Sequence, residues 1–126
     1  LLPVCERCSI TQDDARKMAK LDLVSIHIDA QGREQISESD VWLLESLSQL
    51  RAAGLSAELG FGPDDLLMFE EAIAGVFLKE MTLITDRLQH VSASDAAAIV
   101  QRVQPIVNQI LTRLHDAKIR SFVSAL

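Results

Sequence analysis

The chain has 126 residues, of which 48% are hydrophobic, and a formal net charge of -6 at pH 7. Its longest apolar stretches are far shorter than the roughly 18 residues that a transmembrane helix needs, so we expect no membrane contact and a cytoplasmic location. With 12 basic and 18 acidic side chains, the composition argues against a protein that holds nucleic acid mainly by neutralising phosphates.

Aromatic residues make up only 4% of the chain, and tyrosine is absent. The core must therefore be built chiefly from Leu, Ile, Val and Ala, which is typical of helices packed on helices. At this length the chain can form one domain or a small module with a helical extension. We expect a mainly α fold.

The first clear helix signal follows residue 10. Thr11 is suited to cap a helix N-terminus, and Asp13 and Asp14 supply an acidic first turn. Ala15 and Met18 then begin an apolar face at helical spacing. The pattern predicts a helix of about ten residues.

A short β-hairpin is predicted next. Residues 23–28 alternate apolar and polar side chains, residues 29–32 have turn chemistry that ends in glycine, and residues 33–36 can pair back. These segments form a candidate two-stranded wing.

Helical patterns fill the rest of the chain. Residues 37–40 carry a second N-terminal signal, and the helix after them is expected to end at Gly54, with Trp42 packed where this helix meets its neighbours. Pro63 opens a long apolar-striped helix that is expected to reach about His90.

A last helix is predicted after Ser92, which is suited to cap it. Its apolar face runs through residues 96–114, and Pro105 is expected to kink or split it. Residues 119–126 keep helical spacing to the end, which predicts a docked C-terminus.

Few residues suggest catalysis or metal binding. Cys5 and Cys8 form a single C-x-x-C pair without the further ligands of a zinc site, which favours two buried thiols that behave as small hydrophobes. His27, His90 and His115 are far apart and lie in no nucleophile, metal or phosphate motif. We expect no enzyme, no metal and no cofactor.

Several segments of the first half occur in a characteristic order. They are Ile10-Thr11-Gln12-Asp13-Asp14-Ala15-Arg16, Asp22-Leu23-Val24, Asp29-Ala30-Gln31-Gly32-Arg33, Ile36-Ser37-Glu38-Ser39-Asp40-Val41 and Leu50-Arg51-Ala52-Ala53-Gly54-Leu55-Ser56. Taken in this order, the five segments resemble five parts of MerR family regulators: the recognition-helix opening, the step into the wing, the wing turn, the entry to the next helix and the closing segment. Residues 1–7 would then form the first helix, with Pro3 in its opening turn.

The resemblance implies a winged helix-turn-helix with a small β wing over residues 1–58. A helical bundle containing a long helix would follow over residues 59–126 as a dimerisation or effector domain. The implied function is transcriptional regulation by a homodimer that binds DNA, with modulation by a small molecule as an option. The side chains implied to contact DNA are Thr11, Gln12, Arg16, Lys17, Lys20 and Arg33.

An effector would be apolar or amphipathic, and it would lie among residues of types that more often form a core: Trp42, Phe69, Phe77 and Met81.

Two departures from the family pattern favour an alternative. Lys17-Met18 stands where the family usually has a Tyr-Tyr pair, and Glu34 stands where its wing usually has an arginine. Residues 1–56 hold six basic and nine acidic side chains. The alternative is a protein-interaction module without DNA contact, similar to the CbpM-type modulators of DnaJ-like co-chaperones.

Overall fold

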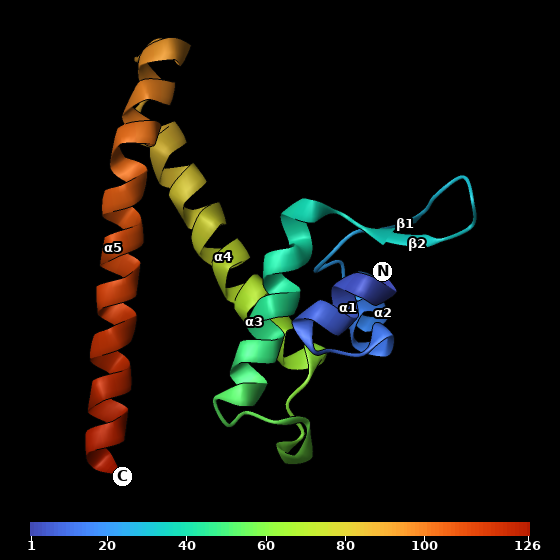
Figure 1. Ribbon diagram of the computed structural model, residues 1–126. Helices are drawn as coiled ribbons and strands as arrows, with labels where there is room; N and C mark the ends of the chain where they lie inside the picture. The colour runs from blue at the N-terminus through green and yellow to red at the C-terminus, as the bar shows by residue number, and fades with distance from the viewer. The chain divides into compact units, whose positions relative to one another are not determined.

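Helices dominate the structure, a computed structural model that describes residues 1–126 (Figure 1). In chain order the elements are α1 (Leu2–Cys8), α2 (Gln12–Lys20), β1 (Ile26–Ile28), β2 (Glu34–Ile36), the 3-10 turn η1 (Glu38–Asp40), α3 (Val41–Ala52), the 3-10 turn η2 (Ala57–Leu59), α4 (Pro63–Arg87) and α5 (Ala93–Ala125). β1 and β2 form a two-stranded antiparallel sheet in which Ile26 pairs with Ile36. The predicted mainly α fold with one small hairpin is confirmed. None of the helices combines the length and the apolar character that crossing a bilayer requires.

The chain divides into two compact units, Leu1–Lys79 and Glu80–Leu126. The first contains α1 to α3, the hairpin and most of α4, and the second contains the end of α4 and all of α5. The functional division expected at residue 58 rests on the family resemblance and stays a prediction.

The core of the first unit forms where α1, α2 and α3 meet. Its fully buried large side chains are Met18, Leu44, Leu47 and Cys5, and Leu66 from the start of α4 joins the same cluster. Both cysteines are free and buried, as the interpretation as small hydrophobes predicted, and burial raises the pKa of the Cys5 thiol.

A capping box fixes the start of α2. Thr11 Oγ1 accepts a hydrogen bond from the backbone N–H of Asp14 at 3.0 Å, and the Asp14 carboxylate accepts one from the backbone N–H of Thr11 at 3.3 Å. One turn later Ala15 and Met18 are completely buried. The cap and the apolar face are both as the sequence predicted.

Asp14 also joins α2 to α3. Its carboxylate accepts hydrogen bonds from Arg51 Nη1 at 2.7 Å and Nη2 at 3.2 Å, and the two side chains are only 16% and 20% exposed. The hydrogen bonds from Arg51 lower the pKa of Asp14, and the same pair raises the pKa of Arg51. Little solvent screens this bridge, so we expect it to stabilise the α2–α3 junction.

Replacement of Asp14 by asparagine is expected to lower the free energy of unfolding by about 2 kcal/mol at neutral pH, because it removes a charged hydrogen-bond acceptor. The pKa of Asp14 is lower in the folded than in the unfolded state. The bridge therefore stabilises the fold fully at a pH above the unfolded-state pKa, and this stabilisation is lost as the pH falls through the folded-state pKa. Urea unfolding at neutral and acid pH measures this contribution. The control is Asp13→Asn, since Asp13 is 95% exposed and makes one 3.4 Å contact; equal losses in both variants would contradict a role for the bridge.

The β1–β2 hairpin is held by its turn. The Asp29 carboxylate accepts hydrogen bonds from the backbone N–H groups of Gln31 and Arg33, each at 2.9 Å, and Gly32 adopts a φ of 77° that favours glycine. At the base of the hairpin, the Asp40 carboxylate accepts from the backbone N–H of Ser25 at 2.8 Å. Figure 1 shows the hairpin as an arm beside α1 and α2.

Helix α3 begins where residues 37–40 predict a helix start, with the 3-10 turn η1 before it and Asp40 as its N-cap residue. One expectation around α3 is wrong. Trp42 is 61% exposed rather than packed, because Leu44 and Leu47 form the buried face of α3 and residue 42 lies outside it.

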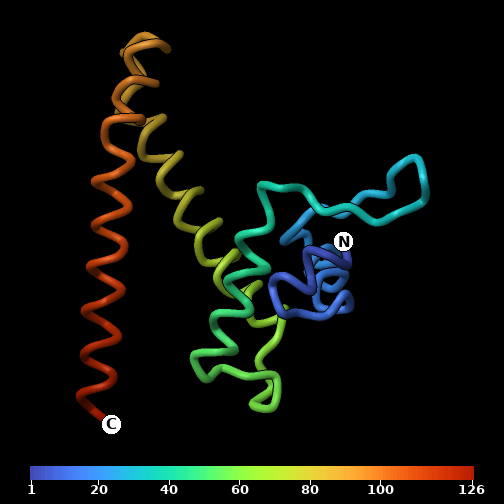
Figure 2. Tube along the Cα trace, viewed as in Figure 1, coloured from blue at the N-terminus to red at the C-terminus, as the bar shows by residue number.

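The second unit is a helical pair formed by the end of α4 and the start of α5 (Figure 2). Met81, Ile84 and Leu88 are half-buried, as are Ile99 and Val100. Ser92 caps α5 as predicted, with Oγ accepting from the backbone N–H of Asp95 at 3.2 Å.

Of the kink or split expected at Pro105, the split does not occur: α5 continues through this residue, since one proline removes only one backbone donor from a long helix. A second expectation for α5 is wrong. The C-terminal side chains are not docked within the chain: Ile119, Phe122, Val123 and Leu126 are all exposed.

Candidate nucleic-acid interface

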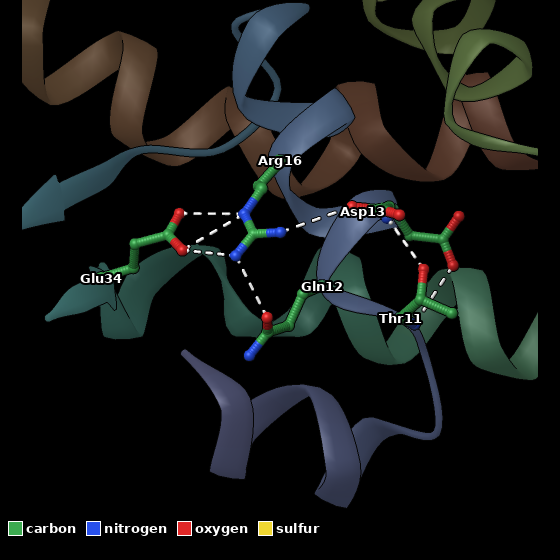
Figure 3. A network of polar contacts seen from close by, with 6 residues as sticks. Thr11, Gln12, Asp13, Arg16 and Glu34 are labelled. Atoms are coloured by element: carbon green, nitrogen blue, oxygen red, sulfur yellow. Dashed lines mark hydrogen bonds and ion pairs between the residues drawn. The ribbon is translucent and has the colours of Figure 1, made fainter.

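Helix α2 and the hairpin together present a charged surface. We define the α2–hairpin surface as residues 11–20 and 26–36. Figure 3 shows Arg16 on α2 reaching the carboxylate of Glu34 on β2, with Gln12 and Asp13 beside it. The contact means that two segments 18 residues apart in sequence lie side by side.

Arg16 and Glu34 make a forked contact. Arg16 Nη2 donates to Glu34 Oε1 at 2.7 Å, and Arg16 Nε donates to both carboxylate oxygens at 3.2 Å. These hydrogen bonds lower the pKa of Glu34 and raise the pKa of Arg16. The guanidinium makes two further contacts, from Nη2 to Gln12 Oε1 at 3.1 Å and from Nη1 to Asp13 Oδ1 at 3.4 Å.

Two more of the predicted DNA contacts are paired with carboxylates. Lys17 Nζ lies 2.6 Å from Asp64 Oδ2 at the start of α4, and Arg33 Nε lies 3.2 Å from Asp29 Oδ2 across the hairpin turn. The Lys17 side chain is 52% exposed and the Arg33 side chain 69% exposed. Ion pairs at this exposure contribute little to stability, so a competing anion can exchange with the carboxylate.

The other predicted contacts have simpler surroundings. Thr11 uses its hydroxyl oxygen in the capping box, and Gln12 accepts from Arg16. Lys20 ends α2, is exposed and makes no ion pair. Structure and sequence thus agree that these residues belong to one helix and its cap.

The sequence did not predict which carboxylates pair with the basic residues of this surface. The α2–hairpin surface carries four basic and four acidic side chains, so it is close to neutral. The sequence shows that Glu34 departs from the arginine usual in the wing of the regulators that the chain resembles, but its contact with Arg16 is long-range. The Lys17–Asp64 pair is also long-range, and no local sequence pattern predicts it.

The other two kinds of site considered from the sequence are a metal site and an effector site. The structure contains no group of three or more His, Cys, Asp or Glu side chains that could hold a metal ion. Of the proposed effector residues, Phe69 lines a shallow depression with Leu59 and Met68, and Met81 lines another with Thr85. Comparison with protein-family models, curated proteins and solved structures found no match.

Proposed function

We propose that this chain is a MerR-like transcriptional regulator that binds DNA as a homodimer through a winged helix-turn-helix. In this proposal α2 enters the major groove as the recognition helix, and the β1–β2 hairpin is the wing that lies along the adjacent backbone. The DNA contacts would come from the six residues named above, and the regulator would act on promoters as an activator or a repressor.

One observation carries the proposal: the capped helix α2 lies beside the hairpin, so that Arg16 on α2 reaches Glu34 on β2. Gln12, Arg16, Lys17 and Lys20 lie on that helix, and Arg33 lies at the hairpin turn. Side chains of these types supply phosphate and base-edge contacts in DNA-binding proteins. The element order α1, α2, hairpin, α3 and long helix also fits the resemblance.

The proposed homodimer is supported by the exposed apolar side chains of α4. Ile73 is 55% exposed and Phe77 58% exposed, and their spacing places them on one side of the helix. An apolar stripe of this kind is a typical helix-pairing surface. Two protomers would then present two copies of α2 to two half-sites.

Replacement of Phe77 by glutamate is expected to convert the dimer to a monomer, because it buries a charge in the proposed helix interface. Size-exclusion chromatography with light scattering would show the mass fall by about half. Lys79→Gln changes the net charge equally on the same exposed helix and should leave the dimer intact. A wild-type monomer, or a Phe77→Glu dimer, would contradict this interface.

The second candidate function is a protein-interaction module, such as a modulator of a co-chaperone. The specific observation that favours it is the pairing of Arg16, Lys17 and Arg33 with carboxylates of the same chain, which cancels most of the surface's positive charge. A partner protein would not require net positive charge.

A gel shift separates the two candidates. The purified protein is mixed with DNA from upstream of its own gene and with a random duplex, at about 50 mM and about 200 mM salt. The regulator predicts a discrete complex that prefers the upstream DNA and weakens with salt. Absence of a complex at the lower salt concentration would contradict the regulator and favour the protein-interaction module.

A further inference from the structure

We infer that Glu34 is an internal competitor for DNA: it occupies the guanidinium edge of Arg16 that a phosphate would otherwise take, and so sets the affinity of the α2–hairpin surface. This inference rests on the proposed function, and it identifies a residue that limits affinity rather than one that contacts DNA.

The geometry of the pair carries the first step. A phosphate binds arginine most strongly through two parallel N–H donors. In Arg16 the parallel donors Nε and Nη2 both point to the Glu34 carboxylate, at 3.2 Å and 2.7 Å from Oε1. A phosphate can use this edge only after Glu34 has left it.

The exposure of the pair carries the second step. The Arg16 side chain is 46% exposed and the Glu34 side chain 30% exposed. Water and ions therefore reach both groups, and the pair can open without unfolding the hairpin. Glu34 thus competes with phosphate for Arg16 but does not block it permanently.

The charge balance carries the third step. The α2–hairpin surface holds equal numbers of basic and acidic side chains, and loss of one carboxylate gives it a net charge of about +1. The logarithm of the DNA affinity falls linearly with the logarithm of the salt concentration, with a slope of about -0.9 for each phosphate neutralised. One more neutralised phosphate therefore raises affinity about eightfold at about 0.1 M salt.

The test compares wild type with Glu34→Gln, a nearly isosteric change that removes the charge. Affinity for a fluorescent random duplex is measured by anisotropy over a series of salt concentrations. We expect Glu34→Gln to bind about eightfold more tightly near 0.1 M salt and to steepen the salt slope by about 0.9. Thermal unfolding of each protein checks that the fold is retained.

Asp13→Asn is the matched control. It removes the same charge beside Arg16, but Asp13 makes only one 3.4 Å contact and leaves the Nε and Nη2 edge with Glu34. We expect at most a twofold gain from Asp13→Asn, because the Asp13 side chain is 95% exposed and its charge is screened by salt. Glu34→Arg, which places the family's usual residue in the wing, should exceed the gain of Glu34→Gln.

The outcomes are distinct. Equal gains in Glu34→Gln and Asp13→Asn would overturn the competitor role and leave only a general charge effect. A wild-type complex with no gain in Glu34→Gln would overturn the inference while the proposed function stands. Absence of binding by every variant at about 50 mM salt would overturn both.

Discussion

Replacement of Leu44 by alanine is expected to lower the free energy of unfolding by about 3 kcal/mol, because a buried leucine loses its transfer free energy and leaves a cavity. Leu44 has no exposed surface and lies in the cluster that joins α1, α2 and α3. A first unit with so small a core has few other large side chains to compensate. Urea unfolding at a fixed protein concentration measures the loss.

Leu59→Ala is the control for this prediction. The chemical change is the same, but Leu59 is 74% exposed, so the expected loss is within about 0.5 kcal/mol. If the two variants had similar stability, the three-helix junction would not be the principal core.

The second large effect is expected for Arg16→Ala, which should weaken DNA binding about tenfold or more at about 0.1 M salt. The variant loses a cation at the centre of the α2–hairpin surface and leaves the Glu34 carboxylate unpaired in front of the phosphates. Stability should change little, because Arg16 is exposed and its ion pair is screened.

Anisotropy titrations with the same duplex test this loss. Arg102→Ala is the control, since it removes one exposed cation from α5 in the second unit. We expect wild-type affinity from Arg102→Ala. Equal weakening by the two variants would indicate that total charge, rather than α2, determines binding, and unchanged affinity in Arg16→Ala would remove Arg16 from the interface.

Local signals in the sequence predicted much of the fold. Thr11 with Asp14 and Ser92 with Asp95 act within one helical turn, and the structure has both caps. The hairpin followed from alternating apolar and polar side chains and a turn that contains glycine. Such patterns depend on residues three or four positions apart, which is why sequence alone reveals them.

The wrong expectations concern tertiary contacts. Exposure of Trp42 depends on which face of α3 meets α1, and no periodicity in a short, broadly apolar helix settles that choice. The C-terminal side chains have helical spacing whether or not a surface covers them. The absence of a split at Pro105 has a local cause, since a long helix can continue past one missing hydrogen bond.

The candidate site was predicted only in part, because local patterns reveal some of its residues and long-range packing determines the others. Its basic residues follow from their place on a capped helix and a hairpin turn, which are local features. Their acidic partners follow from packing: Glu34 meets Arg16 only once the hairpin lies beside α2, and Asp64 meets Lys17 only once α4 begins next to it. Sequence thus indicates the cations of this surface, and the structure adds the carboxylates that restrain them.

The most direct test of the proposed DNA interface is an amide NMR titration of the wild-type protein with duplex DNA from upstream of its gene, at about 50 mM salt. The proposal predicts shift changes concentrated in residues 11–20 and 26–36, with the Arg16 side-chain Nε–H signal among them. Shift changes confined to other segments, or none at all, would contradict a DNA-binding role for α2 and the hairpin.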